Sequence, residues 1–435
     1  MKRVEVLIVI FVLLLSLLLR LHNYDIYPQR GASSDEYTYS FLGVSLITQH
    51  VPISWSYFSA YKNKYELIID KLYFPIVSPY FDHPPLNGLL VGGWSMLFGY
   101  DTFYKIELRV IRLVPIILSM ISSILVFLLG RYLYGYKTGL WALLIYGTTT
   151  IFVMNGRVVF AENLLTPLIL GSVYLFLRWN KKISNKRALI LGTICGLAFW
   201  TKEVGVVLYV SLLYIFITEK TKLPRILLLS GLFFLFFGAY LFYGWYYDWE
   251  VFKQIMESQA SRVVGPETLH LLISKPIIVN KIYNDGWYFL GFLTFFFSFL
   301  DYKKHKLILV PVAAYFMILI FSLTKEGEMG WYMIPMFPFM ALFTAYFLVE
   351  SLKTKNWFIF VLLTFVGLAQ IKFLYEDNFG LTTTQFRVLV FLLFGPLLIT
   401  LLLHKDKLFN YIGNFWFYLF IAANIFLTYT YIHPA

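Results

Sequence analysis

Long apolar runs separated by short polar or basic segments recur along the 435-residue chain. A helix needs about 20 mostly apolar residues to cross a hydrocarbon core of roughly 30 Å. The first run, residues 4–21, has no small-residue cleavage pattern after it, so we expect a retained helix rather than a signal peptide. The other expected spans are residues 110–130, 138–154, 163–178, 188–201, 204–218, 226–246, 287–300, 307–323, 332–350, 357–374, 387–403 and 409–431. The pattern predicts an all-α polytopic membrane protein with about thirteen transmembrane helices.

One apolar segment, residues 84–99, does not fit this series. It is only 16 residues long, opens with two prolines and contains four glycines. If it spanned the membrane, the basic loop 131–137 and every later basic loop would fall outside, against the positive-inside rule. We therefore expect this segment to lie in the interface or to re-enter. The N-terminus is then cytoplasmic and the C-terminus lies outside.

The predicted topology leaves two sizeable outer loops, residues 22–109 and 247–286. Trp and Tyr are frequent in both, and such side chains anchor segments at the headgroup level of a bilayer. We therefore expect short interfacial helices in the first loop. With no fixed-period repeat or flexible linker, residues 1–435 form a single membrane-embedded unit.

Composition and charge support this interpretation. The chain is 59% hydrophobic, 20% aromatic and 14% charged, whereas about 25% charged residues are typical of soluble proteins. One cysteine, Cys195, excludes a secreted disulfide scaffold. The net charge of +12 indicates basic cytoplasmic loops rather than a nucleic-acid surface.

Acidic residues are the strongest candidates for chemistry. Asp35 and Glu36 are adjacent carboxylates just beyond the first helix, and Glu162 lies in a short outer turn. Such groups can act as a general base or bind a divalent cation. Each has a structural alternative. Asp35 and Glu36 would then form a solvated acidic turn, and Glu162 and Arg157 would neutralise each other.

Several outward-facing cationic and imidazole groups lie where a lipid phosphate would be bound. Lys202 and Lys325 occupy outer turns, and His83 precedes two prolines. Each has a structural alternative, since lysines at this level often only extend to the headgroups and a histidine there can be a polar cap. Arg157 has the same status. We find no Gly-rich phosphate loop, His/Cys metal spacing or nucleophile elbow.

These pieces form an ordered series of motifs. They are Leu19-Arg20-Leu21, Asp35-Glu36-Tyr37, His83-Pro84-Pro85-Leu86, Leu97-Phe98-Gly99, Arg112-Leu113, Gly135 to Gly139, Arg157 with Glu162, Thr201-Lys202, and Trp331 to Pro338. The series resembles the GT-C superfamily of polyprenyl-phosphate-sugar-dependent glycosyltransferases, and most closely the protein O-mannosyltransferase and aminoarabinose-transferase branch. The resemblance covers residues 1–215, the catalytic half, well. Residues 216–435 are more variable and match mainly at the Tyr332…Pro335…Pro338 helix.

The resemblance implies roles for these residues. Asp35 would be the general base that deprotonates an acceptor hydroxyl, while the polyprenyl phosphate or diphosphate leaves from the opposite face with inversion. Glu36 and Glu162 would position Asp35, the acceptor or a metal. The substrate-binding residues would be His83, Arg157, Lys202, Lys325 and Tyr332. This branch often has Lys or Glu-Lys at the position of His83 and Asp at that of Glu162, so the donor contacts and any metal site stay open.

The resulting hypothesis is a hexosyl- or pentosyltransferase of the cell or plasma membrane that works on the extracytoplasmic side. Its partners would be a polyprenyl-phosphate sugar donor and a protein, lipid or glycan acceptor, with no nucleic acid. No cofactor is certain, and a divalent cation is possible. The alternatives are a transporter or flippase of lipid-linked sugars, a glycan polymerase or ligase, and a non-catalytic scaffold.

Overall fold

The computed structural model describes residues 2–69, 71–180, 182–261, 267–322, 330–373, 380–403 and 405–434. Most of these residues are helical. This is the expected result for long apolar runs, because in hydrocarbon every backbone N–H and C=O group must be paired within the protein.

Within the described residues, the predicted spans coincide with helices, and some of them, such as residues 138–154 and 357–374, are divided among consecutive helices. The first half contains α1 (Arg3–Leu21), α5 (Leu113–Tyr134), α6 (Tyr136–Thr148), α7 (Thr150–Asn155), α8 (Ala161–Arg178), α9 (Asn185–Thr201) and α10 (Val206–Thr218). The second half contains α11 (Leu223–Ala260), α12 (Glu267–Ser274), α13 (Gly286–Phe297), α14 (Tyr302–Ser322), α15 (Phe337–Thr354), α16 (Ile359–Leu362), α17 (Leu368–Phe373), α18 (Thr383–Leu402) and α19 (Asp406–Thr430). The short 3₁₀ helices are η1 (Phe103–Lys105), η2 (Glu203–Gly205), η3 (Ser298–Asp301) and η4 (Gly330–Met336), and η5 (Leu363–Gly367) is a π-helix.

Within the described residues, seven helical stretches are long and apolar enough to cross a membrane. One of them, Gly286–Ser322, contains both α13 and α14. These two helices fold back on each other, since the rings of Phe295 and Phe316 lie 5.5 Å apart. The chain is an integral membrane protein, whereas the count of thirteen spans and the side of each terminus stay predictions.

The helix α11 is longer than the sequence pattern indicated. It continues through residues 247–260, where we expected an outer loop, after a break at Asp248. The segment beyond the break is amphipathic: Phe252 and Ile255 are buried, and Lys253 and Gln254 are exposed. This apolar face packs on the protein and keeps the segment helical.

The all-α prediction is wrong in the first outer loop. Besides the expected short helices α2 (Asp35–Thr48), α3 (Pro85–Leu97) and α4 (Leu108–Ile111), it contains β1 (Ser54–Trp55), β2 (Tyr65–Ile69) and β3 (Leu72–Val77). These strands form an antiparallel sheet in the order β1-β3-β2. β-Branched and aromatic residues fill the strands, which is typical of a half-buried sheet. A second small sheet pairs β4 (Ile277–Ile278) with β5 (Lys281–Ile282).

Close packing of two glycine-containing helices fixes the first loop. A Cβ atom on Gly43 of α2 would lie 1.9 Å from the carbonyl oxygen of Gly88 in α3, so no larger residue fits there. The 13 residues of α3 extend roughly 20 Å. The helix α3 packs along α2 of the same outer loop, and the prediction that residues 84–99 do not span stays a prediction.

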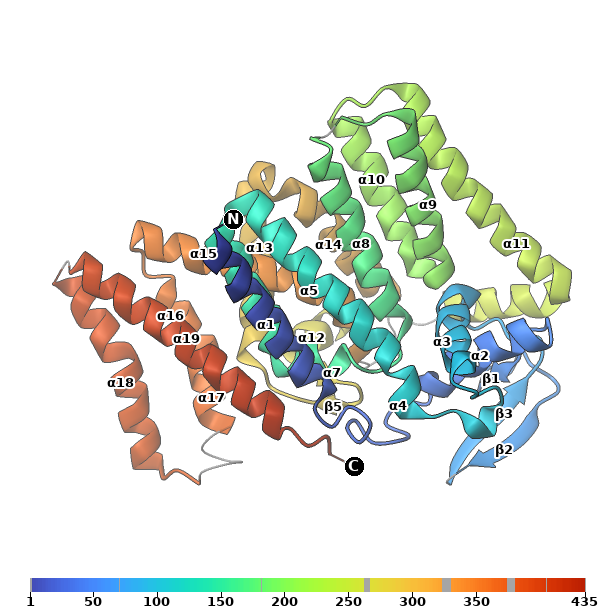
Figure 1. Ribbon diagram of the computed structural model, residues 1–435, viewed down its shortest axis with the longest axis horizontal. Coiled ribbons are helices and arrows are strands. Elements are labelled where there is room, and N and C mark those ends of the chain that lie inside the picture. The colour runs from blue at the N-terminus through green and yellow to red at the C-terminus, as the bar shows by residue number, and fades with distance from the viewer. Residues whose placement is uncertain are drawn as a thin grey trace.

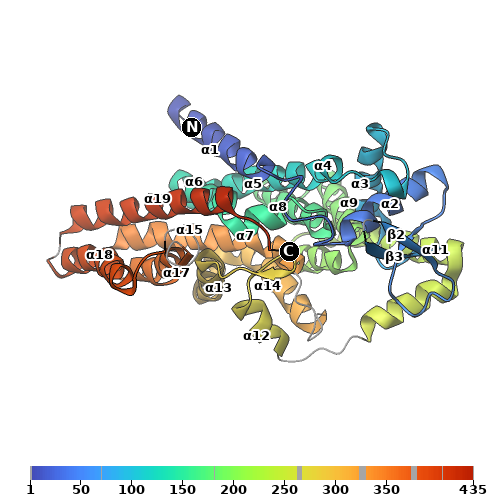
Figure 2. The ribbon, with the colours of Figure 1, turned by 90° about the horizontal axis from the view of Figure 1, so that it is seen from below.

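The helices form a flattened bundle with the first outer loop at one end. Figures 1 and 2 show α2, α3 and the β1–β3 sheet beside the ends of α9 and α11, while α18 and α19 lie at the far side of the molecule. The centre contains α15, which packs against α5, α6 and α13 and is almost wholly buried. The loop elements therefore rest on the half of the bundle that carries the predicted site residues.

Candidate active site

Asp35 is the first residue of α2. The indole Nε1 of Trp55 donates a hydrogen bond of 3.1 Å to the carbonyl oxygen of Ser34, which ties the start of this helix to strand β1. The N-terminus of a helix favours a negative charge. The fold thus presents the Asp35 carboxylate at a fixed position.

Glu36, the neighbouring carboxylate, points away from Asp35 into the protein. Arg112 binds it in a bidentate ion pair, with Nε–Oε1 and Nη2–Oε2 distances of 2.9 and 2.7 Å. The backbone N–H of Val159 also donates to Glu36. Both charged side chains are fully buried. Glu36 thereby connects α2 to the start of α5.

Asp35 faces a cavity of about 560 Å³, which we call the Asp35 cavity. It lies between the first outer loop, the end of α9 and η4. Its lining residues are Asp35, Trp55, Tyr57, Phe58, Ser59, Asp82, His83, Lys202, Trp331 and Tyr332. The cavity therefore brings together four residues that the sequence singled out: Asp35, His83, Lys202 and Tyr332.

Lys202 is the cation of this cavity. It follows the last residue of α9, and its Nζ lies 2.5 Å from Oε1 of Glu162 on α8. The same nitrogen lies 4.8 Å from the ring centroid of Tyr332. Glu162 is 1% exposed and does not itself line the cavity. A buried carboxylate and an aromatic ring thus hold the ammonium group in place.

A second carboxylate, Asp82, lines the cavity next to His83. The hydroxyl of Tyr61 donates a 2.8 Å hydrogen bond to Asp82 Oδ1. The imidazole of His83 stacks on Tyr39, with ring centroids 5.2 Å apart. Because Tyr39 belongs to α2, this stacking places His83 on the same wall as Asp35.

The two cavity carboxyls have raised pKa values. Burial raises the pKa of Asp35 to about 6; the Lys202 charge opposes this rise, and Glu162 and Glu36 add to it. Burial also raises the pKa of Asp82 to about 7, against the hydrogen bonds from Ser56 and Tyr61. A base is most useful when its pKa lies near the working pH, so both groups are suited to proton transfer.

The other two predicted cations are Arg157 and Lys325. Arg157 is buried and donates through Nη1 to the carbonyl oxygen of His22 at 2.7 Å. It does not line the Asp35 cavity, and Glu162 is paired with Lys202 rather than with Arg157. The alternative in which Arg157 and Glu162 neutralise each other is therefore wrong. Lys325 lies outside the described residues.

The carboxylates do not fit a divalent cation. Asp35, Glu36 and Glu162 were the candidate ligands, but Glu36 binds Arg112 and Glu162 binds Lys202. Across the described parts of the chain, no group of three or more His, Cys, Asp or Glu side chains is placed to hold a metal ion.

Sequence reasoning missed several residues of the cavity wall. Asp82 was visible only as the neighbour of His83, and Trp55, Tyr57 and Trp331 were interpreted as interfacial anchors or parts of a motif. Nothing in the local pattern distinguishes an aromatic residue that lines a cavity from one that contacts lipid. Arg112 was part of a motif, but only the fold shows that its partner is Glu36.

Comparisons with known proteins found a matching family and a related sequence. Residues 82–243 match the family of dolichyl-phosphate-mannose-protein mannosyltransferases. The chain is 29% identical over 365 residues to an uncharacterized protein of Aquifex aeolicus, with 77% of this chain and 66% of that protein covered. It thus spans slightly less than two thirds of that relative.

Two solved structures share the fold. One is ArnT from Cupriavidus metallidurans bound to undecaprenyl phosphate, with a TM-score of 0.58, 12% identity, and 99% of this chain and 78% of ArnT covered. The other is the oligosaccharyltransferase AglB from Archaeoglobus fulgidus in complex with an inhibitory peptide and a dolichol-phosphate, with a TM-score of 0.50, 12% identity, and 96% and 56% covered. The resemblance predicted from the motifs is confirmed: the chain is similar to GT-C glycosyltransferases and has their fold.

Proposed function

We propose that this protein is a membrane glycosyltransferase that moves a sugar from a polyprenyl-phosphate carrier to a hydroxyl group of a protein, lipid or glycan. The observation that carries the proposal is the pairing of a base and a cation across one cavity. The Asp35 carboxylate and the Lys202 ammonium group both line it, and the buried Glu162 holds Lys202 in place. Undecaprenyl phosphate in ArnT and dolichol-phosphate in AglB support a lipid-phosphate donor.

In the proposed reaction, Asp35 takes the proton of the acceptor hydroxyl as its oxygen attacks the anomeric carbon. A new carbon–oxygen bond forms on one face of the sugar. The bond from the anomeric carbon to the carrier phosphate breaks on the other face, which gives inversion. The electron pair of that bond goes to the phosphate oxygen, where Lys202 stabilises the charge that develops.

The remaining residues act through these two groups or on the substrate. Glu162 positions Lys202, and Glu36 with Arg112 positions the helix that presents Asp35. His83 and Tyr332 line the cavity beside the donor phosphate and sugar. Because the carrier delivers an activated sugar, this mechanism needs no nucleotide site. The cavity belongs to the loops that the positive-inside rule places on the extracytoplasmic side.

The test is transfer by purified protein carrying Asp35→Asn. The probes are dolichyl-phosphate mannose and its undecaprenyl counterpart, supplied with hydroxyl-bearing peptide, lipid and glycan acceptors. General-base catalysis contributes about 10²- to 10⁴-fold, so we expect kcat to fall by that factor while the melting temperature stays within a few degrees. Near-normal transfer by this variant would exclude Asp35 as the base.

A matched control removes a carboxylate elsewhere in the same loop. Asp101 is exposed and paired with Lys105, so Asp101→Asn should keep full activity. Product mass separates the alternatives: one added sugar supports a transferase, and many support a polymerase. Movement of the labelled carrier across proteoliposomes without a covalent product would instead indicate a flippase.

A further inference from the structure

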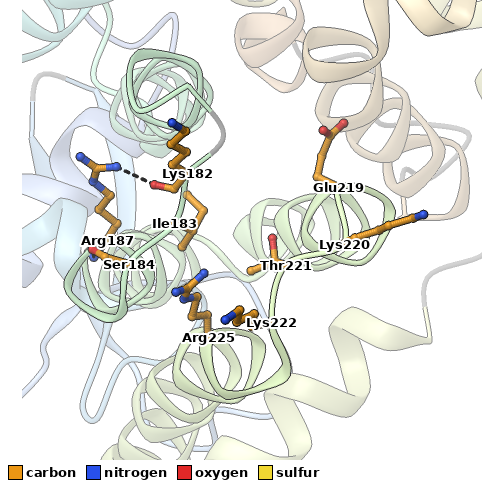
Figure 3. Close-up of a pocket in the computed structure, with 9 residues that line it drawn as sticks. All are labelled: Lys182, Ile183, Ser184, Arg187, Glu219, Lys220, Thr221, Lys222 and Arg225. Carbon is orange, nitrogen blue, oxygen red and sulfur yellow. Dashed lines mark hydrogen bonds between the residues drawn. The ribbon is translucent and has the colours of Figure 1, made fainter.

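A second pocket lies at the opposite end of α9 from the Asp35 cavity. Its volume is about 430 Å³, within the usual range of ligand sites, and we call it the basic pocket. It lies between the α8–α9 loop and the α10–α11 turn (Figure 3). Its lining residues are Lys182, Ile183, Ser184, Arg187, Glu219, Lys220, Thr221, Lys222 and Arg225. The 17 residues of α9 separate the two pockets by roughly 25 Å.

The basic pocket carries an excess of positive charge. Five of its nine lining residues are Lys or Arg, and the carboxylate of Glu219 already binds Lys306 at 3.0 Å. Figure 3 shows Arg187 on one side of the pocket and Lys222 and Arg225 on another. Like charges at this density repel one another, and a bound anion would relieve the repulsion.

Backbone dipoles add to this field. The helices α9 and α11 both begin at the pocket, at Asn185 and Leu223. The partial positive charge at these helix ends favours an anion, although Pro224 has no N–H and the N–H of Arg187 already donates to Ser184 Oγ. The pocket therefore combines cationic side chains on two elements with two helix N-termini.

One of the arginines is already held in place. The guanidinium carbon of Arg187 lies 5.2 Å from the ring centroid of Trp179, and its Nη1 donates a 2.6 Å hydrogen bond to the carbonyl oxygen of Lys182. A planar guanidinium group fixed in this way loses little freedom when it binds a phosphate through its other N–H groups.

The surface next to the pocket is apolar. Leu189 and Ile190 on α9 and Leu223 and Leu227 on α11 are large exposed side chains in the first turns of the two helices. The helix α11 is among those long and apolar enough to cross a membrane. A cationic pocket directly beside an apolar helix surface matches a molecule with a phosphate headgroup and acyl chains.

We propose that the basic pocket binds the phosphate of an anionic membrane lipid. Arg187, Lys222 and Arg225 contact the phosphate oxygens, and the acyl chains lie along α9 and α11. On the predicted topology the pocket faces the cytoplasm, so the lipid comes from the inner leaflet. This site does not depend on the glycosyltransferase function proposed above.

The experiment measures lipid binding to the full-length protein in detergent. Short-chain phosphatidylglycerol, short-chain phosphatidylcholine and inorganic pyrophosphate are titrated separately, and the melting temperature and bound mass are followed. We expect phosphatidylglycerol to bind and to raise the melting temperature, and phosphatidylcholine to do neither. Arg187→Gln with Arg225→Gln should weaken phosphatidylglycerol binding about 30-fold, the effect of removing two cations from a phosphate site.

Two further variants guard against misfolding and general charge effects. Lys222→Gln with Arg225→Gln changes only the α11 side and should weaken binding by a similar factor. Lys186→Gln with Lys303→Gln removes two exposed charges that do not line the pocket and should leave phosphatidylglycerol binding unchanged.

Each outcome decides the proposal. Binding of phosphatidylglycerol but not pyrophosphate, lost in both pocket variants, supports a lipid site. Binding of both ligands, lost in the same variants, supports a phosphate site that pyrophosphate can also occupy. No binding to the wild type, or equal weakening by the Lys186 and Lys303 control, overturns the proposal.

Discussion

The Asp35 cavity and the basic pocket lie at the two ends of one helix, α9, and they handle charge in opposite ways. In and around the cavity, Glu36 is paired with Arg112 and Glu162 with Lys202, in both cases out of water. In the basic pocket, Lys182, Lys220 and Lys222 are exposed and of one sign. One site pairs opposite charges within the protein, and the other presents mainly cationic side chains to its surroundings.

The difference indicates what each site can do. Charges that are buried and fixed act through a low effective dielectric and need no reorganisation during a reaction. Exposed lysines are screened by water and salt, and their interactions are weak. The Asp35 cavity is therefore suited to catalysis, whereas the basic pocket is suited to binding. Four experiments test this contrast.

The largest effect is expected from breaking the buried Glu36–Arg112 pair. Glu36→Gln leaves the Arg112 guanidinium buried without its counter-charge, which costs about 3–5 kcal/mol of stability. Unfolding in detergent measures the loss. The exposed Asp101–Lys105 pair is the control, and Asp101→Asn should cost less than about 1 kcal/mol. Equal losses from the two substitutions would contradict the distinction between buried and exposed charges.

The next effect concerns Lys202. Lys202→Met removes the cation beside the leaving phosphate and should lower kcat about 10²- to 10³-fold. Because this variant leaves Glu162 buried and uncompensated, Lys202→Met with Glu162→Gln provides a folded form that should be equally inactive. Lys186→Met, at the other end of α9, should retain normal kcat. If the double variant kept its activity, Lys202 would have no catalytic role.

A smaller effect is expected from pH. Asp35 must be ionised to accept a proton, and its pKa is about 6. Transfer measured as kcat/KM should therefore be constant above about pH 7 and fall tenfold per unit below about pH 5.5. A profile that rises toward acid pH would rule out Asp35 as a base.

The smallest effect is expected in the basic pocket. In detergent without anionic lipid, Arg225→Gln removes one of several repelling cations, so stability at low salt should rise by about 0.5 kcal/mol or less. Salt screens the same repulsion, and the gain should therefore disappear at about 1 M salt. Melting curves at two salt concentrations measure it. A stability loss of several kcal/mol would mean that Arg225 is a structural residue like Arg112.

The pattern of apolar and polar residues was sufficient to predict the helices, but it did not predict the strands of the first outer loop. Apolar runs such as residues 110–130 must become helices in a membrane, because a helix is the only conformation in which a single segment pairs all of its own backbone N–H and C=O groups. Residues 54–77 have no such constraint, and their pairing into a sheet depends on contacts between strands. The extension of α11 beyond Asp248 likewise depends on the burial of Phe252 and Ile255 against the rest of the protein.

The sequence by itself determined that this is a helical membrane protein, because hydrophobic length and composition are local properties of the chain. The ordered motifs also identified Asp35, His83, Lys202 and Tyr332, which line one cavity. Only the tertiary structure decided that Glu36 binds Arg112 and that Glu162 binds Lys202 rather than the nearby Arg157. Those partners lie 76 and 40 residues apart in the chain. The environment of a buried charge is set by whichever segments pack around it, and local sequence does not record that packing.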